Sequence, residues 1–289
     1  MPAPRSARRA LVAILCALFL LTGPLAGSAA AKKDKRALLP PQEAYEQAMQ
    51  KMAKKRYYQA RAMLQEILPR VAPEDRELLP KVQLAIADAF FRDGGVLNYG
   101  EALNAYRNFL TYFPQHEQAA YAQFMIGQSM YRQVLSPDRD QTMTLKAIEE
   151  LKKVEAIYPK SPYAEGARQT IELCTAQLGE KERLVGRFYQ RRKSYFAAID
   201  RYRYAIDHYP SAAASSRLLY DLGASLLAVN RKEEAEEVFA KLQQAPEHED
   251  WSRKAERAMR NYDKRREKEG EKIFGELGKE PPPKKKGTP

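Results

Sequence analysis

The sequence predicts an all-α protein, built from about five stacked helix pairs and closed by a C-terminal helix. Apolar residues recur at helical spacing through most of the 289-residue chain. A pattern of small and large residues returns several times along it, as in repeat proteins. Beyond the apolar N-terminal segment there is one cysteine, so a disulfide framework cannot replace a packed core.

The repeat is clearest at three places where an aromatic residue precedes a proline, at Pro114, Pro159 and Pro210. Proline cannot continue a helix and restricts the residue before it, so each marks a helix end. An alanine lies twelve residues before each proline, a large residue follows four later, and an apolar residue three after that. These positions are Ala102, Tyr106 and Phe109; Ala147, Leu151 and Val154; and Ala198, Tyr202 and Ala205. Their spacing describes one face of a helix.

The helix before each of these three segments, and the one before Ala235, has a small residue between large ones. Two antiparallel helices approach closely only where one side chain is small, so we expect these residues at the helix crossings. They are Ala87, Gly127, Gly186 and Gly223. This arrangement is typical of tetratricopeptide repeats, and Ala60 and Ala235 mark a first and a last repeat. The sequence therefore predicts a tetratricopeptide-repeat solenoid of about five helix pairs.

The repeats are longer than the usual tetratricopeptide unit, which locates insertions. One lies near Gly94 and another between the helices of the third pair, where it contains Asp138, Arg139 and Asp140. Ser161 and Pro162 predict a helix start that leads into an unusually long helix through about residue 192, with Gly179 as a candidate break. We expect the aspartate-rich insertion to be a candidate partner contact.

Both ends differ from the repeats. A basic start, an apolar run over residues 10–21 and small residues at 26–31 predict a secretory signal peptide, with an uncleaved membrane anchor as the alternative. Spacing of Trp251, Ala255, Ala258 and Tyr262 predicts an amphipathic helix that caps the last repeat; contact with a separate partner or with lipid is the alternative. The predicted segments are a signal peptide (1–31), a basic linker (32–41), the repeat domain (42–245), the C-terminal helix (246–278) and a disordered Pro/Lys tail (279–289).

The net charge of +12 belongs to the ends of the chain. Counting acidic and basic residues leaves 37–252 near neutral and places the excess before residue 37 and after Arg253. Such basic arms suit anionic lipid or an acidic partner protein. We expect no nucleic-acid partner, because the leader directs the chain out of the cytoplasm.

The sequence offers no catalytic or metal-binding motif. His116, His208 and His248 stand in different loops or helix ends, and phosphate or dinucleotide loops are missing. Cys174 lies in an apolar stretch and is predicted to be a small buried side chain. The acidic pair Glu149-Glu150 is predicted to be solvated. We therefore expect a non-enzymatic protein without cofactor.

A binding surface is the remaining expectation. The first helices of the repeats line the concave side of such a solenoid, and aromatic and arginine side chains there are usual anchors for an extended peptide. Inter-repeat packing explains each aromatic equally well. The predicted groove residues are Tyr45, Asp88, Phe91, Arg92, Gln128, Tyr131 and Arg132.

Several stretches resemble the BamD family of outer-membrane β-barrel assembly proteins. The most similar are 158–164 (YPKSPYA), 185–189 (VGRFY) and 195–202 (YFAAIDRY), together with the Asp138–Asp140 insertion. The likeness covers about residues 40–245. It implies a non-catalytic protein at the periplasmic face of the outer membrane.

The resemblance also implies partners. C-terminal repeats of this family bind the POTRA domains of BamA, within a complex of further subunits, and Arg201 falls where the family has an arginine facing BamA. The N-terminal repeats would receive unfolded outer-membrane proteins. One departure concerns Cys16, which follows Leu15 rather than a small residue and does not read as a lipidation site. The alternative is a periplasmic adaptor resembling CpoB, in cell-envelope and peptidoglycan coordination.

Overall fold

Within the described residues, five helix pairs follow one another, as the repeat pattern predicted. The computed structural model describes residues 39–213, 215–243 and 249–277, and all regular elements there are helical. The pairs are α2 (Pro41–Ala53) with α3 (Tyr57–Ile67), α4 (Leu78–Asp93) with α5 (Val96–Tyr112), α6 (Ala119–Tyr131) with α7 (Thr142–Ile157), α8 (Ala164–Arg191) with α9 (Tyr195–His208), and α11 (Ser216–Ala228) with α12 (Lys232–Ala240).

Short elements and a long helix complete the fold. They are η1 (Leu68–Arg70), α10 (Pro210–Ala213), η2 (Lys241–Gln243) and α13 (Glu249–Leu277). The predicted signal peptide, most of the basic linker and the Pro/Lys tail lie outside the described residues. No helix within the described ranges is both long and apolar enough to cross a membrane.

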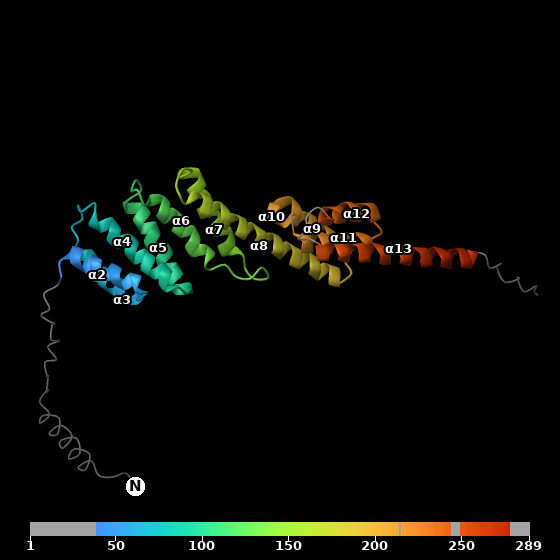
Figure 1. Ribbon diagram of the computed structural model, residues 1–289, viewed down its shortest axis with the longest axis horizontal. Coiled ribbons are helices and arrows are strands. Elements are labelled where there is room, and N and C mark those ends of the chain that lie inside the picture. Colours follow the sequence, from blue (N-terminus) through green and yellow to red (C-terminus); the bar gives the residue numbers. More distant parts are fainter. Residues whose placement is uncertain (1–38, 214, 244–248, 278–289) are drawn as a thin grey trace, which may run out of the picture. The chain divides into compact units, whose positions relative to one another are not determined.

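Each helix packs against its partner and against the next pair, which makes the chain a solenoid. Figure 1 shows the helices in chain order from α2 in blue to α13 in red, with the two members of a pair side by side. The contacts run from α2 with α3 and α3 with α4 through α7 with α8 to α9 with α11. A single pair would leave an apolar face exposed, so stacking supplies the core.

The predicted small residues lie at the helix crossings. A Cβ added to Gly127 would come within 2.5 Å of the Leu151 side chain, and one on Gly186 would collide with the Tyr202 ring. Gly223 stands against Phe239 in the same way. The marker alanines of all five repeats are completely buried, which confirms their predicted place.

Turns within a pair use residues with positive φ. Lys55, Lys193 and Asn230 have φ of 57°, 61° and 60° between the helices of the first, fourth and fifth pairs. In the second pair Gly94 and Gly95 have φ of 76° and 87°. This left-handed conformation reverses the chain direction within a few residues, and its steric cost is lowest for glycine. The third pair has the longer insertion instead.

The long helix differs from its prediction at two points. It begins at Ala164, and the Ser161 hydroxyl, expected to cap it, is buried without a hydrogen-bond partner among the described residues. It continues through Gly179 without a break. The reason is packing, because a Cβ on Gly179 would come within 2.5 Å of the Ala212 Cβ in α10. The glycine permits a close contact, not a kink.

The C-terminal helix covers the end of the last repeat. Ala255 and Tyr262 are buried in the same cluster as Leu219, Leu222 and Phe239. The Trp251 ring lies 5.6 Å from the Tyr220 ring of α11, measured between centroids. This packing agrees with the predicted cap.

Glu150 was predicted to be solvated, and this is wrong. Its side chain is 12% exposed and accepts hydrogen bonds from Gln123 Nε2 of α6 at 2.9 Å, Lys153 at 3.0 Å and Arg107 of α5 at 3.2 Å. Burial alone would raise the pKa of Glu150, but the bonds from Gln123 and Lys153 outweigh it and lower the pKa. Glu149 remains exposed. Adjacent helix positions point apart, so one member of the acidic pair can join three helices.

The helix crossing at Gly186 gives a first prediction. Gly186→Ala should lower the free energy of unfolding by about 1–3 kcal/mol, because the added methyl overpacks against Tyr202. Gly100→Ala, within α5, meets no atom within 4 Å and should be neutral or slightly stabilising. Urea unfolding followed by circular dichroism measures both. Equal destabilisation of the two variants would contradict a close helix contact at Gly186.

Glu150 gives a prediction about pH. Its folded-state pKa lies below the ordinary 4.5, so its contribution to stability is present above pH 4.5 and is lost as pH falls through the lowered value. Glu150→Gln should therefore reduce stability at neutral pH and flatten the fall in stability below pH 4.5. Thermal melts from pH 3 to pH 7 test this. Parallel curves for wild type and variant would show that Glu150 is not the titrating group.

Candidate functional site

Arg201 lies on α9, beside the C-terminal half of α8. Its Nη1 donates to Glu182 Oε2 of α8 at 3.2 Å. The arginine side chain is 46% exposed, whereas that of Glu182 is 11% exposed. The buried carboxylate fixes one edge of the guanidinium, and this bond uses one of five N–H donors. The arrangement presents a held, positively charged group at the surface.

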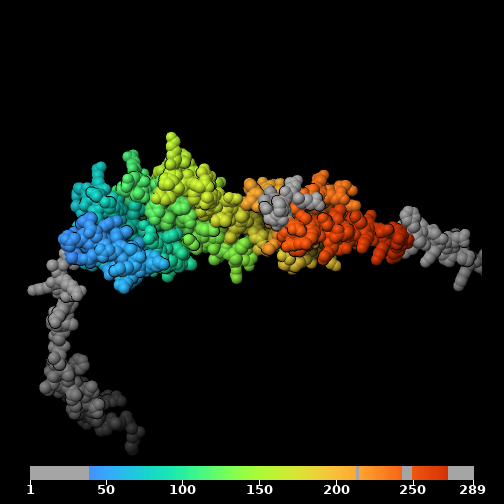
Figure 2. All heavy atoms as spheres, in the orientation of Figure 1, coloured from blue at the N-terminus to red at the C-terminus, as the bar shows by residue number. Residues whose placement is uncertain are grey.

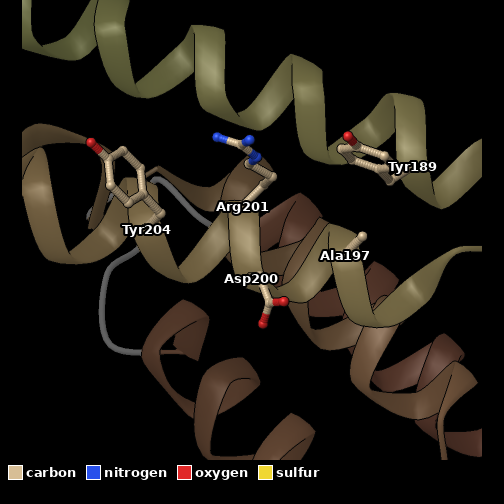
Figure 3. A pocket seen from close by; sticks show the side chains of 5 residues that line it. All are labelled: Tyr189, Ala197, Asp200, Arg201 and Tyr204. Atoms are coloured by element: carbon tan, nitrogen blue, oxygen red, sulfur yellow. The ribbon is translucent and has the colours of Figure 1, made fainter.

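A hollow of about 370 Å³ opens beside this arginine. It is lined by Tyr189 of α8 and by Ala197, Asp200, Arg201 and Tyr204 of α9. Figure 3 shows Arg201 reaching toward α8, Tyr204 on one side of it and Tyr189 on the other, with Asp200 pointing away. Lining groups of both polar and aromatic character suit a protein partner that offers a carboxylate to the arginine.

Exposed aromatic side chains lie on the same two helices as the hollow, and one of them, Tyr204, lines it. Tyr204 is 41% exposed and stacks on His208 with ring centroids 3.9 Å apart. Phe188 is 44% exposed and lies under the Arg192 guanidinium, 4.5 Å from it. Phe196 of α9 is 66% exposed. Aromatic and arginine side chains are the types enriched where binding energy concentrates in protein interfaces. We call the hollow and these aromatics the Arg201 surface.

A buried arginine fixes the same part of α8 to the last repeat. The Arg183 side chain is 2% exposed and makes two bonds to Glu180, at 2.6 and 2.7 Å. Its Nη1 lies 2.7 Å from Asp221 Oδ2 of α11. The hydrogen bonds that Arg183 donates to these carboxylates, that of Glu180 foremost, raise the pKa of Arg183, so the guanidinium stays charged. Arg183 therefore holds the fourth and fifth repeats in one register behind the Arg201 surface.

The predicted groove residues divide into two groups. Asp88 accepts hydrogen bonds from Tyr106 at 2.5 Å and Tyr121 at 2.7 Å, and Gln128 donates to Thr170 of α8 at 2.8 Å. These two side chains therefore connect neighbouring helices.

The other groove residues are aromatic or basic. The partly buried rings of Tyr45, Phe91 and Tyr131 pack against core clusters. Arg92 and Arg132, near the ends of α4 and α6, are exposed. Packing thus accounts for much of the stripe and leaves two arginines at the surface.

The aspartate-rich insertion is ordered by its own bonds. Ser136 donates to Asp138 at 2.6 Å, which lowers the pKa of this carboxyl, and Asp140 accepts from the Thr142 hydroxyl at 2.9 Å. Arg139 is exposed. Buried Gln141 donates to the backbone carbonyls of Ser136 and Arg139. Both aspartates therefore shape the loop.

The loop also borders a second hollow, of about 440 Å³, against α8. Pro137 and Asp138 line it from the loop, and α8 contributes the rest: Lys181, Leu184, Val185, Phe188 and Tyr189. Tyr189 thus borders both hollows. The insertion and Arg201, distant in sequence, lie against the same helix.

The described residues contain no group of three or more His, Cys, Asp or Glu that could hold a metal ion. Cys174 is 1% exposed against Met130 and Ala147, and burial raises its thiol pKa to about 11. A buried, protonated thiol is a poor nucleophile. The prediction of a small buried side chain is confirmed.

Sequence reasoning missed Arg183, Glu182 and the aromatics around Arg201. In the sequence Arg183 follows three charged residues, Glu180 to Glu182, and looks like one more surface charge. Only its contact with Asp221 shows that it joins two helices. Phe188 and Phe196 flank the turn between α8 and α9, and this position is the sequence feature that could have indicated exposed aromatic side chains there. Helical spacing alone does not distinguish an exposed aromatic from a core one.

Comparison with known proteins gives a consistent result. The family model described as YfiO, outer membrane lipoprotein, matches residues 38–242. The outer membrane protein assembly factor BamD of Rickettsia prowazekii is 27% identical over 249 residues, covering 86% of this chain and 97% of that protein. BamD of Caulobacter vibrioides is 30% identical over 137 residues, 47% of this chain and 45% of that protein. BamD of Neisseria meningitidis serogroup A is 28% identical over 214 residues, 68% and 78% respectively.

The Arg183 cluster gives a prediction about stability. Arg183→Met keeps the aliphatic length but leaves the Asp221 carboxylate without its cation, and should cost about 3 kcal/mol, near the lower end for a buried pair because Glu180 is partly exposed. Arg168→Met removes an exposed pair with Glu165 and should leave the melting temperature unchanged. Differential scanning calorimetry compares them. Similar melting temperatures for the two variants would contradict the assigned role of Arg183.

Proposed function

Because the chain belongs to the YfiO family of outer membrane lipoproteins, we propose that it is a non-catalytic scaffold in outer-membrane protein assembly. The relatives that match most of its length are named assembly factors. Its solenoid fold offers surfaces for binding other proteins. This function places the chain at the cell envelope, on the periplasmic side of the outer membrane.

The observation that carries the partner proposal is the Arg201 surface. A half-exposed arginine, fixed by a buried carboxylate and bordered by exposed aromatics, has the composition of an interface hot spot. We infer that POTRA domains of BamA bind here and bring a carboxylate opposite Arg201. The resemblance at residues 195–202 supports this, because the family has an arginine at that position. Other subunits of the complex are partners in the same proposal.

The N-terminal repeats are the proposed site for unfolded outer-membrane proteins. Exposed Arg92 and Arg132 lie near the ends of two first helices, next to the partly buried rings of Phe91 and Tyr131. An arginine beside an aromatic can bind an extended peptide through its backbone carbonyls and its side chains. Asp88 and Gln128 would support this surface, because both are hydrogen-bonded between helices.

Affinity capture from membranes tests the two surfaces against each other. Arg201→Glu should reduce the recovery of BamA at least about tenfold, since it replaces an attractive charge by a repulsive one. Arg92→Glu, the matched control, should leave BamA recovery unchanged and weaken binding of an unfolded outer-membrane protein. Arg201→Gln removes the charge beside Glu182 with less repulsion and should be intermediate. Melting temperatures of all variants are recorded.

Two results would contradict the proposal. Equal BamA recovery with Arg201→Glu and wild type would remove the POTRA contact from this surface. Recovery of only septal or peptidoglycan-synthesis proteins would favour the CpoB-like adaptor instead. A folded Arg201→Glu variant that loses BamA alone is the supporting result.

A further inference from the structure

Between Lys254 and Lys272, one face of α13 carries only basic side chains and one amide. When residues are placed around a helix of 3.6 residues per turn, these side chains fall within an arc of about 100°. We call this arc the basic face. Its members are Lys254, Arg257, Asn261, Lys264, Arg265, Lys268 and Lys272.

The acidic residues of this stretch lie outside the arc. Glu256, Asp263 and Glu267 project from the opposite half of the helix circumference, and Glu271 lies about 20° beyond the edge of the arc. Asp250, one turn before Lys254, lies on the side of the arc and pairs with Arg253. Glu269, next to the basic face, lies 4.0 Å from the Arg265 Nε. The arc from Lys254 to Lys272 therefore contains no acidic side chain, whereas Arg260 and Arg266, outside it, pair with Glu256 and Glu269.

The basic face does not take part in the packing of α13. Ala255 and Tyr262, on another side of the helix, are buried against the last repeat. Every member of the basic face is exposed. Two members lie over aromatic rings of the same helix, with Lys254 Nζ 4.0 Å from the Trp251 ring centroid and the Arg265 guanidinium 5.4 Å from that of Tyr262.

The basic face runs well past the last buried contact. From Lys254 to Lys272 the helix is about 27 Å long at 1.5 Å per residue. Residues 263–269, 271 and 272 are all exposed. Figure 2 shows this part of α13, in red, with its visible face uncovered by the other helices. A straight row of cations at regular intervals matches a surface that presents many anions in one plane.

We propose that the basic face of α13 binds the anionic phosphate headgroups of a membrane surface. Each lysine or arginine near an anionic bilayer adds to the attraction, and a row on one side of a rigid helix allows several to act together. The family is described as outer membrane lipoproteins, which places a bilayer within reach of the chain. The sequence continues with three more lysines at 284–286. The site is independent of Arg201 and of the proposed assembly role.

Headgroup binding fits better than an acidic protein or a nucleic acid. The face lacks an exposed apolar or aromatic side chain at its centre, which a specific protein interface would normally contain. Its aromatic neighbours, Trp251 and Tyr262, are engaged in packing against the last repeat. The same lysines and arginines would also attract the phosphates of a nucleic acid, and the experiment below distinguishes a nucleic acid from a membrane surface.

Co-sedimentation of the full chain with vesicles tests the proposal. Vesicles of phosphatidylglycerol with phosphatidylethanolamine are compared with vesicles of phosphatidylcholine alone, at low and high salt. The triple variant Lys264→Gln, Lys268→Gln, Lys272→Gln should lose affinity for the anionic vesicles by about tenfold or more. A control with the same change in net charge, Lys54→Gln, Lys152→Gln, Lys160→Gln, alters exposed lysines elsewhere in the chain and should bind within about twofold of wild type.

The conservative triple variant with arginine at 264, 268 and 272 should retain binding, which separates charge from helix folding. Salt-sensitive binding to the anionic vesicles, lost only in the glutamine variant of α13, supports the proposal. Equal loss in both glutamine variants would show an effect of net charge alone and overturn it. Wild-type binding to single-stranded DNA or an acidic protein, with none to anionic vesicles, would overturn it as well.

Discussion

The close approach of paired helices at small residues is the constraint on which the rest of the structure depends. Gly186 lies against the Tyr202 ring and Gly179 against Ala212, so α9 and α10 both pack tightly on α8. At this separation Arg201 of α9 can donate a hydrogen bond to Glu182 of α8. A larger side chain at the crossing would push α9 away and with it the arginine. The geometry of the Arg201 surface is therefore set by two buried glycines, Gly179 and Gly186.

Buried polar groups then fix how one repeat sits on the next. Asp88 joins the hydroxyls of Tyr106 and Tyr121, Glu150 joins α5, α6 and α7, and Arg183 joins α8 to α11. Apolar packing alone tolerates some sliding between helices, whereas a satisfied polar group has one good position. These groups lie between consecutive repeats and specify their register. Through Arg183 the Arg201 surface is connected to the last repeat.

The repeat architecture could be predicted because burial at a crossing demands small residues at a fixed spacing. The five marker alanines, Tyr106, Leu151 and Tyr202 are all completely buried, as their spacing required. The site was less predictable. Asp88 and Gln128 were placed in a groove by their helical position, but their hydrogen bonds reach across to other helices. Glu150, Glu182 and Arg183 look like surface charges in the sequence, and only contacts distant in the chain bury them. Helical spacing indicates which face of a helix a residue lies on, but not which side chain of another helix contacts it there.

We propose that partner binding depends on the surface formed by the C-terminal half of α8 and by α9. Hydrogen–deuterium exchange of the purified chain, with and without the POTRA domains of BamA, tests it most directly. We expect slower exchange in the presence of the domains for residues 185–204 and unchanged exchange in α2 to α5. Slower exchange confined to α2 to α5, with none on α8 or α9, would contradict the account.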